Sequence, residues 1–206
     1  TEKLTMITAY DALFAKLFDG QVDMILVGDS LNMSFMGEGD TVSATLDQII
    51  YHTKAVCNGA SESYIICDMP FGTCSDKDKA LANATKVYQQ TKADAVKIEG
   101  NNTEVISHLT SNGIAVVGHI GLLPQNARGE GGFVVKGKDE VQKQQIIQDA
   151  IDLQKAGASL MVIEGVKSDV TKEVVDAVDI PVIGIGAGAD ADGQVLVWSD
   201  MLGLFE

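Results

Sequence analysis

Short apolar runs rich in β-branched residues recur along the chain, and they lack the strict alternation of a half-exposed strand. Runs of this kind are typical of parallel strands that are covered on both faces. The pattern predicts eight such strands: Leu4–Ala9, Met24–Val27, Tyr64–Cys67, Ala95–Ile98, Ile114–Gly118, Leu160–Ile163, Pro181–Ile185 and Val195–Trp198.

Longer segments with helical spacing of apolar residues lie between most of these runs. The helices that they predict are Ala12–Phe18, Thr45–Val56, Lys77–Gln90, Thr103–Ser111, Glu140–Ala156 and Asp169–Ala177. Asn102 and Ser168 stand where N-caps are expected, and Gly113 and Gly157 stand where helix C-caps are expected. The alternation of strand and helix indicates βαβ units and a parallel sheet.

The number of strands favours one kind of parallel sheet. Eight strands in this alternation are typical of a closed (β/α)8 barrel rather than of an open doubly wound sheet. The last connection is unusual, since only Ala187–Gln194 separates the seventh and eighth runs, which is too short for a crossover helix. No linker rich in Pro, Gly or Ser divides the chain, so we expect a single domain over residues 1–206.

The composition argues against several classes of binding partner and of structural site. The formal net charge of −14 argues against binding to nucleic acid or to an anionic membrane. No apolar run approaches the roughly 20 residues that span a bilayer. The 3 cysteines form no C-x-x-C pair, so neither a disulfide framework nor a zinc site is indicated, and a cytoplasmic protein is expected. At 206 residues the chain is shorter than the about 250 typical of such a barrel, so we expect the final helix and C-terminal tail to be missing.

Polar side chains gather at the carboxyl ends of the predicted strands. All strands of a parallel barrel open on one face at these ends, and catalytic residues collect there. Lys97 and Glu99 stand two positions apart on one strand, so they point to the same side. The candidate set consists of four carboxylates, one lysine, one histidine and one serine: Asp29, Ser30, Asp68, Lys97, Glu99, His119 and Glu164.

These residue types suit the enolisation of a 2-oxo acid. Three carboxylates from adjacent strands make an oxygen-rich site that prefers Mg²⁺ or a similar divalent cation to zinc. Lys97 can attract a substrate carboxylate, and Ser30 adds a hydrogen-bond donor. A metal that polarises the keto oxygen and a separate carboxylate base complete the parts that the reaction needs.

Each of these residues also has a structural interpretation. Asp29 and Asp68 can cap loops, and Lys97 can simply pair with Glu99. We favour a functional role for Lys97 because an unpaired buried charge is costly. His119 is nearly as well explained as a core histidine, and the glutamate of the sixth strand as part of a structural polar layer.

Two glycine-rich segments allow two interpretations each. Ile183–Gly188 follows a strand without the G-x-G-x-x-G spacing of a dinucleotide site, so tight packing is favoured over an anion site at the barrel mouth. Gly129–Gly132 can form a mobile lid over that mouth, or it can be a plain surface loop.

A set of motifs resembles one enzyme family. The motifs follow one another in the family's order over nearly the whole chain: Thr8-Ala-Tyr-Asp11, Val27-Gly-Asp-Ser-Leu31, Tyr51-His-Thr53, Asp68-Met-Pro-Phe71, Val96-Lys-Ile-Glu-Gly100, Gly118-His-Ile-Gly-Leu122, Pro124-Gln125, Ile180–Gly188 and Asp192-Gly-Gln194. On these residues the chain resembles the ketopantoate hydroxymethyltransferase (3-methyl-2-oxobutanoate hydroxymethyltransferase) family. The resemblance implies a (β/α)8 TIM barrel of the phosphoenolpyruvate/pyruvate superfamily.

The resemblance also implies an activity. Members of the family transfer a hydroxymethyl group from 5,10-methylenetetrahydrofolate to 3-methyl-2-oxobutanoate, which gives 2-dehydropantoate in pantothenate and coenzyme A biosynthesis. The expected cofactor is Mg²⁺, the expected partners are these small molecules, and the expected assembly is a homo-oligomer, commonly a decamer.

The resemblance assigns a role to each matching position. The base that accepts the proton from C3 of the oxo acid is implied to be Glu164. The metal is implied to lie at Asp29, Asp68 and Glu99, with the two aspartates as its direct ligands. Contacts to the oxo acid are implied for Asp29, Ser30, Asp68, Lys97 and His119.

Two other functions stay open at this point. A carbon–carbon lyase of the same superfamily is expected to carry a catalytic cysteine in a Lys-Lys-Cys-Gly-His type loop, and the sequence contains no such motif. A non-catalytic barrel that only binds an oxo acid needs no base, so the presence of Glu164 argues mildly against it.

Overall fold

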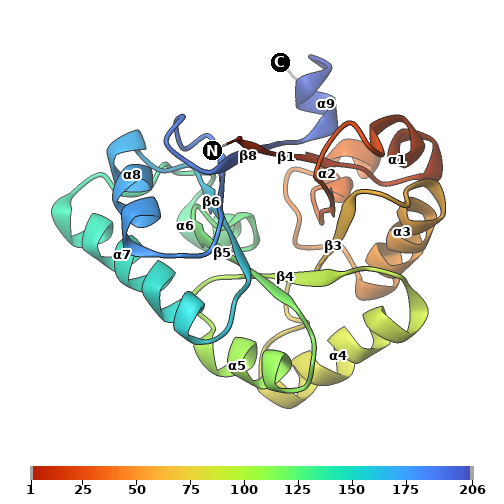
Figure 1. Cartoon of the computed structure of the whole chain (residues 1–206), viewed down its shortest axis with the longest axis horizontal. Helices are drawn as coiled ribbons and strands as arrows, with labels where there is room; N and C mark the ends of the chain where they lie inside the picture. The colour runs from red at the N-terminus through yellow and green to blue at the C-terminus, as the bar shows by residue number, and fades with distance from the viewer. Residues whose placement is uncertain (1, 205–206) are drawn as a thin grey trace.

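The structure is a computed structural model that describes residues 2–204. Within this range eight parallel strands pair in sequence order and close into a barrel, because the last strand also pairs with the first (Figure 1). The strands are β1 (Leu4–Thr8), β2 (Met24–Val27), β3 (Tyr64–Asp68), β4 (Ala95–Glu99), β5 (Val116–Gly121), β6 (Leu160–Glu164), β7 (Val182–Ile185) and β8 (Gly193–Leu196). The predicted (β/α)8 barrel is confirmed.

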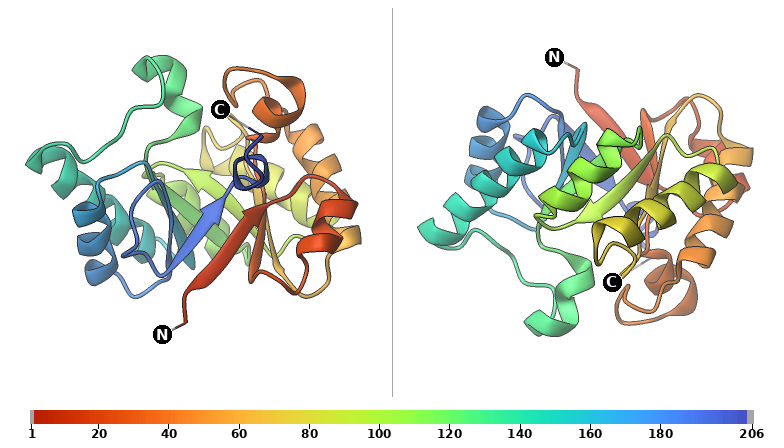
Figure 2. Two further views of the ribbon diagram at one scale, coloured as in Figure 1. Left: turned by 90° about the horizontal axis from the view of Figure 1, so that it is seen from above. Right: turned by 90° about the horizontal axis from the view of Figure 1, so that it is seen from below.

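Helices surround this barrel. They are α1 (Ala12–Phe18), α2 (Leu31–Met36), α3 (Leu46–Gly59), α4 (Lys77–Gln90), α5 (Thr103–Ser111), α6 (Ala127–Glu130), α7 (Glu140–Lys155), α8 (Ser168–Ala177) and α9 (Trp198–Met201), with a 3₁₀ turn, η1 (Pro124–Asn126). The segments around α2 and α6 project from the end of the barrel opposite the N-terminus (Figure 2). Among the residues described, no helix has the length and apolar character needed to cross a membrane.

Alternation along the strands divides the apolar residues between two cores. One core lies inside the barrel, where Met24, Ile66 and Val117 come from different strands. The larger core lies between the strands and the outer helices, and Ile25, Ile106 and other residues of both layers fill it. Strands that are buried on both faces explain why the sequence shows apolar runs without alternation.

The helix ends follow the predicted capping in part. Gly113 and Gly157 follow α5 and α7 with φ of +81° and +101°, a left-handed region that favours glycine. Asn102 is the N-cap residue of α5, but its Nδ2 donates to Cys74 O at 3.4 Å and its side chain caps no helical N–H among the described residues. Ser168 is the first residue of α8 rather than its cap.

The last strand differs from its prediction. It spans Gly193–Leu196 instead of Val195–Trp198, and α9 begins at Trp198. Gly193 pairs with Leu4 of β1, and a Cβ atom at this position would lie only 2.4 Å from Leu4 O. Close approach of two backbones fixes this register, and hydrophobic content alone does not reveal it. The connection from β7 to β8 contains no helix, as its length predicts.

Candidate functional site

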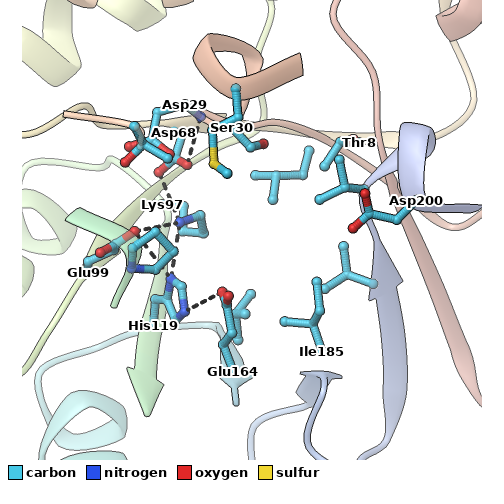
Figure 3. A pocket seen from close by; sticks show the side chains of 18 of the residues that line it. Thr8, Asp29, Ser30, Asp68, Lys97, Glu99, His119, Glu164, Ile185 and Asp200 are labelled. Carbon is cyan, nitrogen blue, oxygen red and sulfur yellow. Dashed lines mark hydrogen bonds and ion pairs between the residues drawn. The ribbon is translucent and has the colours of Figure 1, made fainter. Parts of the chain in front are cut away.

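The carboxyl ends of the strands surround a cavity of about 260 Å³ (Figure 3). All seven residues selected from the sequence line this cavity, although they come from five different strands and the loops that follow them. They form its polar wall: Asp29, Ser30, Asp68, Lys97, Glu99, His119 and Glu164. The opposite wall is mainly apolar and includes Ile185, Val195 and Val197, with Thr8 and Asp200 at its edge (Figure 3).

Two aspartates lie together at the ends of β2 and β3. Their exposed fractions are 3% for Asp29 and 2% for Asp68, and the backbone N–H of Asp29 donates to Asp68 Oδ2 at 3.2 Å. Burial, and then the neighbouring carboxylate of Asp68, raise the pKa of Asp29 well above its usual value. An arrangement that crowds two buried carboxylates is stabilised by positive charge.

Lys97 supplies such a charge from the middle of β4. Its Nζ lies 3.0 Å from Asp68 Oδ1 and 3.9 Å from Glu99 Oε1, and the side chain is only 4% exposed. Burial favours the neutral amine, but the surrounding carboxylates of Asp68, Glu99 and Asp29 prevail and raise the pKa of Lys97 above its usual value. The lysine is therefore an ammonium ion held inside the barrel.

His119 connects this cluster to Glu164. Its Nδ1 lies 3.2 Å from Lys97 Nζ, and its Nε2 lies 3.3 Å from Glu164 Oε2. An ammonium group only donates hydrogen bonds, so Nδ1 accepts from Lys97 and the ring proton stands on Nε2, facing Glu164. Burial raises the pKa of Glu99, whose Oε1 lies 3.7 Å from Nδ1 on the same side of the ring.

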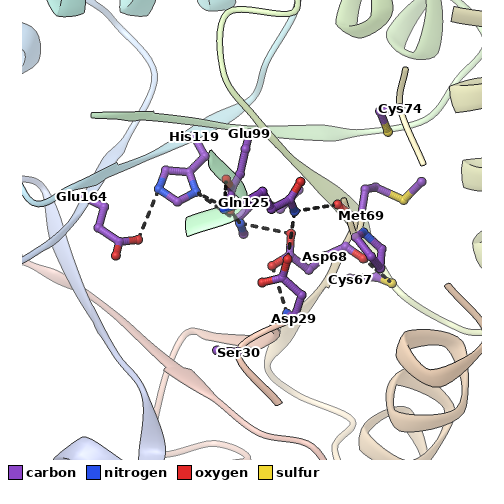
Figure 4. Close-up of polar contacts among 12 residues, drawn as sticks. Asp29, Ser30, Cys67, Asp68, Met69, Cys74, Glu99, His119, Gln125 and Glu164 are labelled. Carbon is purple, nitrogen blue, oxygen red and sulfur yellow. Dashed lines mark hydrogen bonds and ion pairs between the residues drawn. The ribbon is translucent and has the colours of Figure 1, made fainter. Parts of the chain in front are cut away.

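Gln125 contacts the acids of the site, although it was assigned no role from the sequence. It lies in η1, after β5, and its Nε2 donates to Asp29 Oδ2 at 2.9 Å and to Met69 O at 3.0 Å (Figure 4). Its backbone N–H donates to Glu99 Oε2 at 3.1 Å. The Pro-Gln pair belongs to the family motif, but a turn beyond the strand end gave no reason to place it against β2.

Four buried polar atoms of the cavity lining have no well-aligned hydrogen bond among residues 2–204, although three of them lie within ion-pair distance of Lys97 or Glu164. They are Thr41 Oγ1, Asp68 Oδ1, Glu99 Oε1 and His119 Nε2. Buried polar groups of native proteins are almost always paired, so a cluster of such atoms around one cavity indicates a polar ligand. Thr41, in the loop between α2 and α3, was not among the candidates because a single threonine outside a motif carries no signal.

The donor set suits a hard divalent cation. Within the described part of the chain, no group of three or more His, Cys, Asp and Glu side chains stands at metal-binding spacing. Asp29 and Asp68 nevertheless present adjacent carboxylates, whereas Lys97 lies between Asp68 and Glu99. Mg²⁺ commonly uses one or two carboxylates and completes its shell with water and substrate oxygens. The residues therefore fit Mg²⁺ at the two aspartates, with Glu99 farther away.

The two glycine-rich segments lie at the margin of the site. Gly188 packs tightly, since a Cβ atom there would lie 2.5 Å from Ser168 Cβ, in agreement with the favoured packing interpretation. Gly129–Gly132 spans the end of α6 and the turn after it, and the next residue, Phe133, lines the cavity. The segment is thus close enough to the mouth for either interpretation of it.

Comparison with solved structures supports the fold. A phosphonopyruvate hydrolase in complex with oxalate and Mg²⁺ has a TM-score of 0.70 at 11% identity, covering 98% of this chain and 78% of that one. 2,3-Dimethylmalate lyase, a member of the PEP mutase/isocitrate lyase superfamily, has a TM-score of 0.71 at 13% identity, covering 98% and 76%. At such identities the likeness shows a shared barrel.

Comparison of sequences is far more specific. Proteins described as 3-methyl-2-oxobutanoate hydroxymethyltransferase from Aliarcobacter butzleri and Sulfurimonas denitrificans are 65% and 66% identical to the chain. The alignments cover 100% and 98% of this chain, and 77% and 78% of those relatives. The family model for ketopantoate hydroxymethyltransferase matches residues 1–206. The motifs, the barrel and these matches agree, and the chain belongs to the ketopantoate hydroxymethyltransferase family of transferases.

Proposed function

We propose that the chain transfers a hydroxymethyl group from 5,10-methylenetetrahydrofolate to 3-methyl-2-oxobutanoate through an enolate, giving 2-dehydropantoate for pantothenate and coenzyme A biosynthesis. The observation that carries the proposal is the polar wall of the cavity. It combines two adjacent carboxylates, a buried ammonium ion and a separate carboxylate base within one space of about 260 Å³.

Binding of the oxo acid follows from the charges of this wall. The ammonium of Lys97 and the hydroxyl of Ser30 supply donors for the substrate's carboxylate and keto oxygens. Ser30 is itself oriented, because its Oγ lies 2.7 Å from the buried Tyr10 hydroxyl. A Mg²⁺ ion held by Asp29 and Asp68 would act as a Lewis acid that polarises the keto group. Its binding by a phosphonopyruvate hydrolase of the same fold lends support.

Glu164 is the base that we propose for the proton of C3. Its side chain is 24% exposed, whereas the side chains of Asp68 and Glu99 are 3% and 5% exposed, so it is the more solvated acid. It stands at the opposite end of the polar wall from the aspartates (Figure 3), with its Oε2 at 3.3 Å from His119 Nε2. The C–H electron pair becomes the enolate double bond as the proton moves to Glu164.

Carbon–carbon bond formation then consumes the enolate. Water adds to the methylene carbon of the opened folate iminium, and tetrahydrofolate leaves as the C–N bond breaks, which releases this carbon as formaldehyde. C3 of the enolate attacks the formaldehyde carbon, and the aldehyde oxygen takes up a proton to become the hydroxyl of 2-dehydropantoate. The apolar wall at Ile185, Val195 and Val197 can receive the substrate's methyl groups and keeps water from the enolate.

The proposal also covers the cellular location and the oligomeric state of the protein. A cytoplasmic location is supported by three cysteines that are all free thiols. A homo-oligomer, decameric as the family resemblance suggests, is supported by large apolar side chains at the surface, such as Leu13 at 82% exposure and Val141 at 80%. Sedimentation of the full chain would test the assembly.

Deuterium exchange at C3 tests the central step. In D₂O with Mg²⁺, NMR should show the chain exchanging the C3 proton of 3-methyl-2-oxobutanoate, and Glu164→Gln should slow the exchange by about 10²–10⁴-fold. Glu104→Gln is the matched control, because Glu104 pairs with Lys77 at the surface and its side chain is 76% exposed. Exchange by Glu164→Gln at the parent rate would contradict the assignment of the base.

Assays of the same protein sample distinguish the transferase from the carbon–carbon lyase and from the non-catalytic barrel. Turnover that requires tetrahydrofolate and Mg²⁺ supports the transferase. Cleavage of a dialkylmalate without folate would instead indicate the lyase, and tight binding of the oxo acid without exchange would indicate a non-catalytic barrel.

A further inference from the structure

Gln125 occupies a special position relative to the three acids of the site. Its side-chain amide reaches from η1 to the ends of β2 and β3, and its backbone N–H reaches Glu99 at the end of β4. A single residue therefore connects three neighbouring strand ends (Figure 4). Such a residue can set where the acids stand relative to one another.

The orientation of the amide is fixed by its partners. Nε2 contacts Asp29 Oδ2 and Met69 O, and the carbonyl of Met69 is an acceptor only. Each of the two amide hydrogens therefore serves one acceptor. With Met69 O as a rigid anchor, the second hydrogen points at one chosen oxygen of Asp29.

The three acids share a pattern of hydrogen bonding. One oxygen of each accepts from a protein N–H: Asp29 Oδ2 from Gln125 Nε2, Asp68 Oδ2 from Asp29 N, and Glu99 Oε2 from Gln125 N. The second oxygen differs among the three: Asp68 Oδ1 lies 3.0 Å from the ammonium of Lys97 and Glu99 Oε1 lies 3.9 Å from it, whereas the hydrogen bond to the Asp29 carboxylate from a side chain within 2–204 goes to Oδ2. The hydrogen-bonded oxygen fixes the orientation of each carboxylate, and the second oxygen of Asp29 is left to face a ligand.

We propose that Gln125 is a positioning residue that presents the free oxygen of Asp29 to the divalent cation. The proposal rests on the proposed function insofar as it assumes that a cation binds at Asp29 and Asp68. A neutral donor is needed at this place, because a glutamate would add a negative charge without donating and a lysine would compete with the cation. Two of the three hydrogen-bonded oxygens depend on Gln125.

Binding of Mn²⁺ tests the role directly, without turnover. Electron paramagnetic resonance of free Mn²⁺ gives the Kd of Mn²⁺ for the parent chain and for Gln125→Met, which keeps the length of the side chain and removes its donors. We expect the Kd to rise about 10–100-fold, the range found when the partners of metal ligands are removed. The rate of C3 exchange should recover toward that of the parent at saturating metal.

Gln154→Met is the matched control. Gln154 Oε1 accepts from the backbone N–H groups of Asp179 at 2.6 Å and Ile180 at 3.1 Å, before β7 and away from the cavity lining. Its loss should lower thermal stability and leave the Kd for Mn²⁺ unchanged. If Gln125 had only a structural role, Gln125→Met would behave like Gln154→Met, with a lower thermal stability and an unchanged Kd for Mn²⁺.

Three outcomes would overturn the inference. In the first, the parent chain binds no Mn²⁺, and in the second, the folded Gln125→Met variant binds Mn²⁺ with the same Kd as the parent. The third outcome is a Gln154→Met variant whose Kd for Mn²⁺ rises as much as that of Gln125→Met. If Gln125→Met does not fold, Gln125→Asn replaces it, since the shorter amide cannot reach both acceptors and the same rise in Kd is expected. A parent that binds Mn²⁺ but does not exchange the C3 proton refutes the transferase instead, while the ratio of Kd values still decides the role of Gln125.

Discussion

Replacement of Lys97 by methionine should destabilise the protein strongly, because it removes the cation from a buried group of acids. Lys97→Met keeps most of the volume of the side chain and deletes the charge. At an effective dielectric constant of about 20, opposite unit charges 3.0 Å apart attract by about 5.5 kcal/mol. Part of this attraction offsets the desolvation of the lysine itself, and broken buried pairs commonly cost about 3–5 kcal/mol.

Urea unfolding measures this loss. With an m value of about 2 kcal/mol per molar urea, a loss of 3–5 kcal/mol lowers the midpoint by roughly 1.5–2.5 M. Parent and variant are compared at one protein concentration and in EDTA, so that no divalent cation replaces the ammonium. For a domain with about 5–15 kcal/mol of stability, the change is a large share of the total.

Lys86→Met provides the matched control. Lys86 pairs with Asp47 at the surface, where the two side chains are 41% and 80% exposed, so its removal should cost at most about 1 kcal/mol. If Lys97→Met shifted the midpoint no more than Lys86→Met, the idea that Lys97 neutralises buried carboxylates would be wrong. If the free energy of unfolding fell by about 3–5 kcal/mol in both variants, the burial of Lys97 could not be the reason for the loss of stability.

Two further substitutions test the geometry of the site. Gly121→Ala places a Cβ atom 2.4 Å from Glu164 O at a φ of +89°, so it should cost more than the about 1–2 kcal/mol of the backbone conformation alone and slow C3 exchange about 10²-fold by displacing the base. Gly113→Ala, with a φ of +81° and an open surrounding, should show only the conformational cost, and equal losses in both would contradict the clash. Thr41→Val removes a buried hydroxyl that has no partner among residues 2–204, so stability should stay within about 0.5 kcal/mol while the KM for the oxo acid rises. Thr53→Val removes a hydroxyl that donates to a thiol, so it should lose about 1 kcal/mol with no change in KM, and an unchanged KM for Thr41→Val would exclude Thr41 from substrate binding.

The barrel and its polar wall could be predicted from the sequence because both follow from local patterns. A parallel strand covered on both faces has an apolar run, and the residue that ends it points to the barrel mouth. Asp68, Glu99 and Glu164 are the last residues of their strands, so their meeting required only that the strands close into a ring.

Other features depend on contacts between distant segments, which a local pattern does not show. α2 was not predicted, because it has only six residues and its N-cap residue, Ser30, makes no side-chain capping hydrogen bond among the described residues. The register of β8 depends on how closely Gly193 approaches Leu4, and apolar content favoured the neighbouring residues instead. The contact of Gln125 with Asp29 spans 96 positions and joins a turn to another strand's end.

The pairing of the first strand with the last also has a consequence for folding kinetics. Seven of the eight strand pairings join consecutive strands, whereas Leu4 pairs with Gly193 and Trp198 N donates to Thr8 Oγ1 across 190 positions. Contacts of such sequence separation form late, because the entropy of closing a long loop must be overcome first.

An incompletely closed ring would expose the edges of β1 and β8, and unpaired strand edges promote aggregation. It would also lack part of the cavity, since Thr8 and Val195 line opposite sides of that seam. Binding of the oxo acid should therefore appear only in the slowest refolding phase. A ligand added during refolding should increase the yield, because it stabilises the closed ring alone.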